Sequence, residues 1–139
     1  MSTTLVDAEP APIAIDAERT AVIMIDMQRD FLEPGGFGEA LGNDVSRLAA
    51  AIGPCKRLLA AARQSRMLVI HTREGHRPDL SDAPKAKVQR GEPELRIGEP
   101  GPMGRILVRG ASGHEIIPAL SPIANEPVID KPGKGAFYA

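Results

Sequence analysis

Three short apolar runs, each followed directly by polar residues, constrain what this chain can fold into. The first is AVIMI at residues 21–25, the second MLVI at 67–70 and the third VI at 128–129. The runs are too short for lone helices and are rich in β-branched residues, so they predict strands. A run without polar alternation is typical of a strand covered on both faces. We therefore expect residues 22–25, 68–70 and 128–129 to be neighbouring strands of one parallel sheet.

Between the first two runs, apolar residues recur every three or four positions, which predicts a helix with one buried face. This stripe consists of Val45, Leu48, Ile52, Cys55, Leu59 and Ala62. Asn43 fits the N-cap. Gly53-Pro54 interrupts the stripe, so we expect a kinked helix or a short turn before a main helix with Pro54 in its first turn. A strand, a helix and a second strand in this order form a right-handed βαβ unit.

The remaining segments have no sustained period. Residues 1–19 indicate an extended arm, because Pro10 and Pro12 oppose regular structure. Residues 20–139 belong to a single domain, with a long Pro- and Gly-rich loop at 78–104, a short strand at 105–108 and one or two helical turns at 114–120. The predicted fold class is α/β, with a Rossmann-like parallel sheet sandwiched by helices and incomplete at its C-terminal side.

The charge balance and the single cysteine argue against several classes of protein. The chain has 17 basic and 18 acidic side chains, so no long-range field attracts nucleic acid or anionic lipid. No apolar run approaches the roughly 20 residues that span a bilayer, and no secretory signal is evident. One cysteine permits no internal disulfide. We expect a cytoplasmic protein with a free thiol and no nucleic-acid or membrane partner.

Polar residues follow each predicted strand at the carboxyl end, where parallel α/β sheets bind ligands. Asp26 follows the first strand, HTRE at 71–74 the second and Lys131 the third. A carboxylate and an ammonium that meet there can position and tune a nucleophile or a substrate. Ordinary strand-end polarity explains the same residues without chemistry, and the pattern leaves both interpretations open.

Longer strings around these residues resemble one enzyme family. VIMIDMQRDF at 22–31, HTR at 71–73, and KP at 131–132 followed by Phe137 are similar to motifs of the isochorismatase-like cysteine hydrolases. HTREGHRPDL at 71–80, PGPMGRIL at 100–107 and DKPGKGAF at 130–137 are most similar to biuret hydrolase and its ureide-cleaving relatives. The resemblance spans residues 20–139. It implies hydrolysis of a linear amide C–N bond in a small ureide by a cysteine nucleophile.

The resemblance also implies a catalytic triad of aspartate, lysine and cysteine, with Asp26 and Lys131 as the first two members. The family's cysteine lies after the next strand, in a further βα unit of about 30 residues that this chain does not contain. Cys55 is no substitute, because it falls in the apolar helical stripe, where a thiol is usually a small buried hydrophobe. The chain therefore resembles the N-terminal portion of a hydrolase, and we expect it to be inactive alone.

A small planar ureide needs fixed hydrogen-bond donors and acceptors more than apolar area. The candidates for binding it are Phe31, Arg73, His76, Arg77, Arg105 and Phe137. A core position for each phenylalanine and plain surface charge for the basic residues remain open alternatives. The basic residues at 85–90 alternate with acidic ones nearby and indicate a solvated loop. With no Trp and one Tyr, the chain offers little for stacking an aromatic amide such as nicotinamide.

We expect no metal and no other cofactor. Glu74-Gly75-His76 has the spacing of a metal-binding pair in the related nicotinamidases. Leu80 stands where a further histidine would be needed, and two ligands do not make a catalytic site.

Two other classes of function compete with the enzyme hypothesis. One is a truncated or pseudo-enzyme subunit that acts by oligomerisation through an uncovered sheet edge. The other is a nucleotide- or flavin-binding module, which the lack of a glycine-rich turn after Asp26 disfavours. The expected partners are a ureide or amide substrate, further copies of the chain in a homo-oligomer, and a polypeptide carrying the missing C-terminal half.

Overall fold

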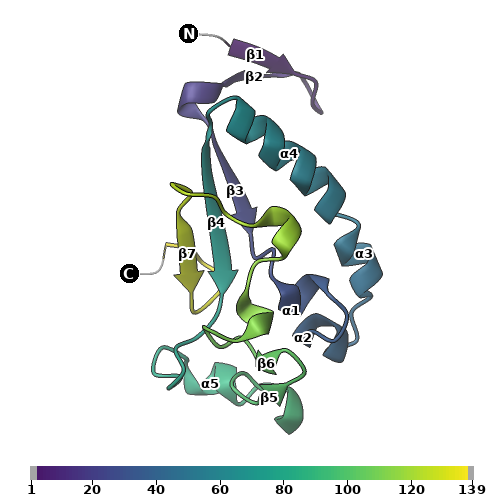
Figure 1. Cartoon of the computed structure of the whole chain (residues 1–139), viewed down its shortest axis with the longest axis vertical. Helices are drawn as coiled ribbons and strands as arrows, with labels where there is room; N and C mark the ends of the chain where they lie inside the picture. The colour runs from purple at the N-terminus through teal and green to yellow at the C-terminus, as the bar shows by residue number, and fades with distance from the viewer. Residues whose placement is uncertain (1–2, 138–139) are drawn as a thin grey trace.

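A computed structural model of the chain describes residues 3–137. Its centre is a three-stranded parallel sheet of β3 (Ala21–Ile25), β4 (Leu68–Glu74) and β7 (Val128–Lys131). β4 lies in the middle, and the three strands run in the same direction (Figure 1). The predicted fold class, an α/β chain with a parallel sheet and flanking helices, is confirmed, and each apolar run supplies one strand.

The apolar stripe between the first two strands forms two helices, α3 (Val45–Ala49) and α4 (Ile52–Gln64). Pro54 lies in the first turn of α4, as predicted, because no N–H is needed there. α4 covers one face of the sheet, and its Leu59 shares a buried core cluster with Met24 of β3. None of the helices within residues 3–137 is long and apolar enough to cross a membrane.

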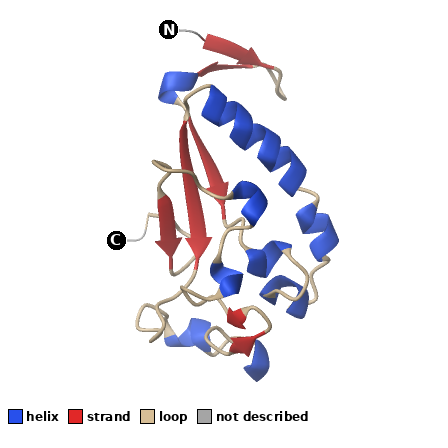
Figure 2. Cartoon of the chain, in the orientation of Figure 1, coloured by secondary structure: helices blue, strands red, loops and turns tan. Residues whose placement is uncertain are grey.

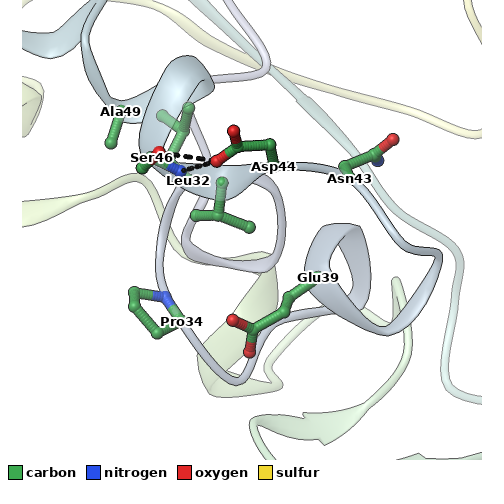
Figure 3. A pocket seen from close by; sticks show the side chains of 8 residues that line it. Leu32, Pro34, Glu39, Asn43, Asp44, Ser46 and Ala49 are labelled. Atoms are coloured by element: carbon green, nitrogen blue, oxygen red, sulfur yellow. Dashed lines mark hydrogen bonds between the residues drawn. The ribbon is translucent and has the colours of Figure 1, made fainter.

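The N-cap of α3 is Asp44, one residue beyond the predicted Asn43. The Asp44 carboxylate accepts hydrogen bonds from the backbone N–H and the hydroxyl of Ser46, at 3.1 and 2.5 Å. Aspartate and asparagine cap about equally well, so the sequence did not distinguish these neighbours. Figure 3 shows the cap at the wall of a cavity of about 310 Å³. The second carboxylate there, Glu39, accepts a bond from the backbone of Gly35 at 2.7 Å, so the acids of this cavity serve local structure.

The opposite face of the sheet is exposed at β3, although Thr72 and Lys131 on the same face are buried. Ile23 and Ile25 lie on it and expose 49% and 62% of their surface. Because side chains alternate along a strand and Ile25 pairs with Thr72, the face also carries Thr72, Glu74 and Lys131. The expectation of strands covered on both faces therefore holds only on the side where α4 packs.

The N-terminal segment is more regular than the predicted extended arm. β1 (Thr3–Val6) and β2 (Ile13–Asp16) pair as an antiparallel hairpin. Pro10 and Pro12 lie in the connection, where they remove no ladder hydrogen bond. The hairpin sits beyond the amino ends of β3 and β4 (Figure 1).

The predicted loop at 78–104 carries short elements, and α5, β5 and β6 gather at the carboxyl ends of the strands (Figure 2). The strand predicted at 105–108 is reduced to β6, because the chain turns at Leu107 with a φ of 50°. The predicted helical turns at 114–120 are two 3₁₀ turns. The bounds are α5 (Lys85–Val88), η2 (Pro93–Leu95), β5 (Pro100–Gly101), β6 (Gly104–Arg105), η3 (Ser112–His114) and η4 (Pro118–Leu120), with η1 (Ala17–Arg19) preceding β3.

Glu126 connects the main helix, the central strand and the segment before β7. Its carboxylate pairs with Arg63 of α4 at 2.7 Å and contacts His71 of β4 at 2.9 Å. The hydrogen bond from Arg63 is the main reason that the pKa of Glu126 falls from 4.5 to about 2.

We expect Glu126→Gln to lower the free energy of unfolding by about 2 kcal/mol near neutral pH, because the charged hydrogen bonds are lost. Since the pKa of Glu126 is lower in the folded chain, this contribution is complete above pH 4.5 and is lost as the pH falls towards 2. Urea unfolding of the unsubstituted chain and of Glu126→Gln, at neutral pH and near pH 2, measures the difference in the free energy of unfolding. This difference should be smaller in acid. An equal difference at both pH values would contradict the role of the charge.

Candidate functional site

Asp26 ends β3 in a backbone conformation that side-chain-bearing residues rarely adopt, with a φ of 53°. Its backbone N–H donates to the carbonyl of Thr72 at 3.1 Å, and the Thr72 hydroxyl donates to Asp26 Oδ1 at 2.6 Å. Such positions persist only where neighbours hold them, and they cluster at functional sites. The turn leaves the second carboxylate oxygen, Oδ2, to contact β7.

The ammonium of Lys131 meets that oxygen. Its side chain is only 2% exposed, and Nζ donates to Asp26 Oδ2 at 2.6 Å and to the carbonyl of Gly133 at 3.0 Å. A buried ammonium needs such partners, because its desolvation otherwise costs several kcal/mol. The structure thus brings together Asp26 and Lys131, 105 positions apart, at the sheet edge where the sequence predicted them. Their catalytic roles stay predictions.

Gln28 fastens the turn after β3 to the end of β4. Its side chain is fully buried, and Nε2 donates to the carbonyls of Glu74 at 2.9 Å and His114 at 3.1 Å. Oε1 accepts from the backbone N–H of Glu74 at 2.7 Å. These three bonds fix the orientation of the amide. The glutamine of the first motif therefore holds the two strand ends in register around Asp26.

Asp30, the second acid of that motif, has a structural role. It lies in α1 (Arg29–Leu32), and Oδ1 accepts from the N–H of Phe37, the first residue of α2 (Phe37–Ala40), at 3.2 Å. Burial raises the pKa of Asp30. A Cβ atom on Gly113 would collide with this carboxylate, so glycine is required there.

A cavity of about 560 Å³ has the usual size for a small-molecule site, and its lining includes Glu74 but neither Asp26 nor Lys131. Glu74 connects this cavity to the Asp26–Lys131 pair, because its Oε1 is 2.8 Å from Lys87 Nζ and its Oε2 is 3.9 Å from Lys131 Nζ. The lining has an apolar side and a charged side: Phe31, Phe37, Leu41, Leu95, Ile97 and Leu107, against Glu74, Lys87, Arg90, Glu92 and Lys134.

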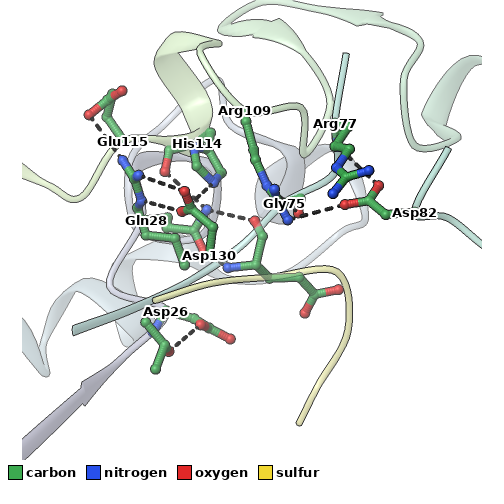
Figure 4. A network of polar contacts seen from close by, with 12 residues as sticks. Asp26, Gln28, Gly75, Arg77, Asp82, Arg109, His114, Glu115 and Asp130 are labelled. Carbon is green, nitrogen blue, oxygen red and sulfur yellow. Dashed lines mark hydrogen bonds and ion pairs between the residues drawn. The ribbon is translucent and has the colours of Figure 1, made fainter. Parts of the chain in front are cut away.

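Of the six residues predicted to bind substrate, Phe31 lines this cavity and the other five do not. Arg73 precedes Glu74 and therefore faces the other side of the sheet. It is held by Asp130, with hydrogen bonds of 2.7 and 3.1 Å. Figure 4 shows Asp130 within a network that includes Glu115 and His114. Arg73 is thus engaged in structure rather than facing the cavity.

The remaining predicted contacts either have protein partners or are exposed to solvent. His76 is fully buried and contacts Asp82 at 3.2 Å, and burial lowers its pKa. Arg77 donates its backbone N–H to the same Asp82, and its side chain is exposed. Arg105 donates to two loop carbonyls at 2.6 and 2.7 Å, so it braces the loop. Phe137 is fully exposed. The structure does not place these four in the lining of the cavity, and their roles in binding stay predictions.

Glu74 and His76 do not converge on one point. Lys87 occupies one carboxylate oxygen of Glu74, whereas the Nδ1 atom of His76 faces Asp82. Within residues 3–137, no three His, Cys, Asp or Glu side chains are placed to hold a metal ion.

Sequence reasoning missed Lys87 and the position of Glu74 in the site. Lys87 was assigned to a solvated loop, yet its side chain is 23% exposed and donates to Glu74 and to the carbonyl of Pro132. The signal for Glu74 was present, since it lies two residues after Thr72 and so on the same strand face. No local pattern marks Lys87, because its partners lie 13 and 45 positions away.

Comparison with known proteins identifies the family. Residues 20–139 match the Isochorismatase domain. The chain belongs to the isochorismatase family. It is 31% identical over 145 residues to the ureidoacrylate amidohydrolase RutB of Yersinia enterocolitica, with 96% of this chain and 60% of that protein covered. The RutB protein of Azorhizobium caulinodans is 28% identical, with 96% and 61% covered.

Solved structures of similar proteins agree with the fold. The cysteine hydrolase of Pseudomonas syringae pv. phaseolicola has a TM-score of 0.69 and 31% identity, covering 99% of this chain and 55% of that one. The N-carbamoylsarcosine amidase of Thermoplasma acidophilum, at 20% identity and a TM-score of 0.58, shares the fold. This isochorismatase-family chain spans about three-fifths of the length of the curated relatives above and about half that of the solved ones.

Proposed function

We propose that this chain is part of an amidohydrolase that cleaves a linear amide C–N bond in a small ureide by cysteine-nucleophile catalysis. The observation that carries the proposal is the 2.6 Å contact between Asp26 and Lys131 at the carboxyl ends of parallel strands, in a chain of this family. The names of the relatives, ureidoacrylate amidohydrolase and cysteine hydrolase, support amide chemistry. The nucleophilic cysteine would lie in the additional length that the relatives have.

In the proposed mechanism, Asp26 takes the proton of the thiol as the thiolate attacks the amide carbonyl. Backbone amides donate to the oxyanion, and Lys131 stabilises the negative charge nearby. The C–N bond breaks as Asp26 returns the proton to the departing ammonia. Water then attacks the thioester and gives a proton to Asp26, which passes it to the thiolate. Throughout, the Thr72 hydroxyl holds the orientation of Asp26 Oδ1.

The proposed substrate is biuret, triuret or an acyclic ureido acid. Such a molecule presents carbonyl and N–H groups along a short chain, and it needs fixed charged or polar partners. On the charged side of the cavity, Arg90, Glu92 and Lys134 supply partners of both signs. Phe31 and Phe37 close the other side.

A substrate panel tests this assignment in the completed enzyme, by which we mean this chain joined to, or assembled with, the segment that supplies the cysteine. We expect kcat/KM for the ureides to exceed that for nicotinamide by at least about 10-fold, because hydrogen-bonding sites reject analogues that leave them unpaired. We also expect a strong chelator to leave the rate unchanged. Preference for nicotinamide, or activity lost on chelation and regained with zinc, would contradict the assignment.

Association with another polypeptide or with further copies is part of the proposal. The open sheet face and the hairpin present apolar side chains, among them Ile25, Leu5 and Ile13, at 62%, 69% and 56% exposure. Apolar surface of this kind favours association. A non-catalytic subunit would use the same surface, so ureide turnover by the completed enzyme distinguishes the two functions.

A further inference from the structure

We propose that Glu74 is a positioning residue for Lys131, and that Lys87 holds Glu74 in place for this task. The inference rests on the proposed function and adds an acidic residue to the pair of Asp26 and Lys131. Glu74 is the last residue of β4 and pairs in register with Lys131 on β7. Its side chain is 15% exposed, so its charge is poorly screened by water.

Glu74 is fixed at both its backbone and its side chain. The backbone N–H and carbonyl each bond Gln28, at 2.7 and 2.9 Å. The carboxylate divides its two oxygens between two cations, with Oε1 2.8 Å from Lys87 Nζ and Oε2 3.9 Å from Lys131 Nζ. A side chain held this firmly gives Lys131 a constant negative neighbour in addition to Asp26.

Lys87 is fixed by a second contact. Its ammonium also donates to the carbonyl of Pro132, the residue after Lys131, at 2.7 Å. Lys87 belongs to α5 in the long loop, so this contact docks the loop on the strand end that carries the site.

The charges therefore alternate in one row, from Asp26 through Lys131 and Glu74 to Lys87. Opposite charges at these separations attract one another, which favours this arrangement of the four side chains. Lys131 has two carboxylate neighbours, so its ammonium keeps its place while the adjacent Asp26 gains and loses a proton during turnover. The other charged groups that line the cavity around Glu74 are Arg90, Glu92 and Lys134.

A purely structural role for Glu74 makes a different prediction. If Glu74 only anchors the loop through Lys87, its removal loosens the loop and lowers stability. The exchange of the Lys131 ammonium protons with water would then be unaffected.

The first test uses the chain itself and needs no turnover. NMR measures the exchange of the Lys131 ammonium protons with water in the unsubstituted chain and in Glu74→Gln, which keeps the shape and removes the charge. We expect this exchange to become about 10-fold faster in the variant, because the ammonium loses one of the charged neighbours that hold it in place. Glu74→Asp, which keeps the charge, should keep most of the slow exchange. Glu33→Gln is the matched control, since it removes a carboxylate paired with Arg29 at 2.7 Å outside the cavity.

The second test is kinetic and uses the completed enzyme. We expect Glu74→Gln to lower kcat by about 10- to 100-fold with little change in KM, and to move both limbs of the pH–rate profile to lower pH. Unchanged exchange of the Lys131 ammonium protons in a folded Glu74→Gln chain would overturn the inference, as would unmoved limbs of the pH–rate profile. If the unsubstituted enzyme hydrolyses no ureide, the proposed function fails, and the NMR exchange measurement still decides the role of Glu74.

Discussion

Replacing Lys131 by alanine in the completed enzyme should lower kcat by about 100- to 10,000-fold while the protein remains folded. The ammonium is the cation that neutralises Asp26, and the thiolate and oxyanion would lose that stabilisation. The fold should survive, because Asp26 is 21% exposed and water can solvate it once Lys131 is gone. Asp26→Asn should cost a similar factor, since the amide keeps an acceptor for Lys131 but cannot take the proton.

The two substitutions should not add. When two residues act as one catalytic unit, replacing either one removes most of the rate enhancement of the pair. The double variant should therefore be about as slow as either single variant. Steady-state kinetics measure the rates, circular dichroism checks the fold, and Lys56→Ala on the exposed side of α4 serves as the lysine control. A loss below about 3-fold in either folded single variant would contradict the catalytic assignment.

The sequence was sufficient to predict that Asp26 and Lys131 meet. Each follows a short apolar run, and parallel strands end at the same edge of a sheet, so the topology alone brings their side chains together. The same reasoning gave the helix between the first two strands, because the stripe that contains Leu59 has one clear period.

Side-chain contacts in the cavity could not be predicted in the same way. Arg73 and Glu74 are adjacent in the sequence, but strand alternation places them on opposite faces of the sheet. Only the pairing of Glu74 with Lys131 shows which of the two residues shares a face with Lys131. Arg105 was predicted to meet substrate, yet loop carbonyls capture its guanidinium. The contacts of Lys87 could be predicted only with knowledge of how the long loop packs against the ends of the strands. These outcomes depend on tertiary contacts that no local pattern encodes.

Cys55 should contribute nothing to turnover. It lies on α4 against the core cluster that includes Leu59 and Met24, whereas the Asp26–Lys131 pair lies at the carboxyl ends of the strands. A catalytic thiolate needs a partly exposed setting with a positive neighbour or an adjacent base. We therefore expect Cys55→Ser to leave the rate of the completed enzyme unchanged.

The most direct test compares ureide hydrolysis by the 139-residue chain alone with hydrolysis by the completed enzyme, each with and without Cys55→Ser. We expect no turnover by the chain alone, because without the nucleophile only binding and polarisation remain. We expect turnover by the completed enzyme, and Cys55→Ser should not alter its rate. Full activity from the chain alone, abolished by Cys55→Ser, would contradict the claim that Asp26 and Lys131 serve a cysteine outside this chain.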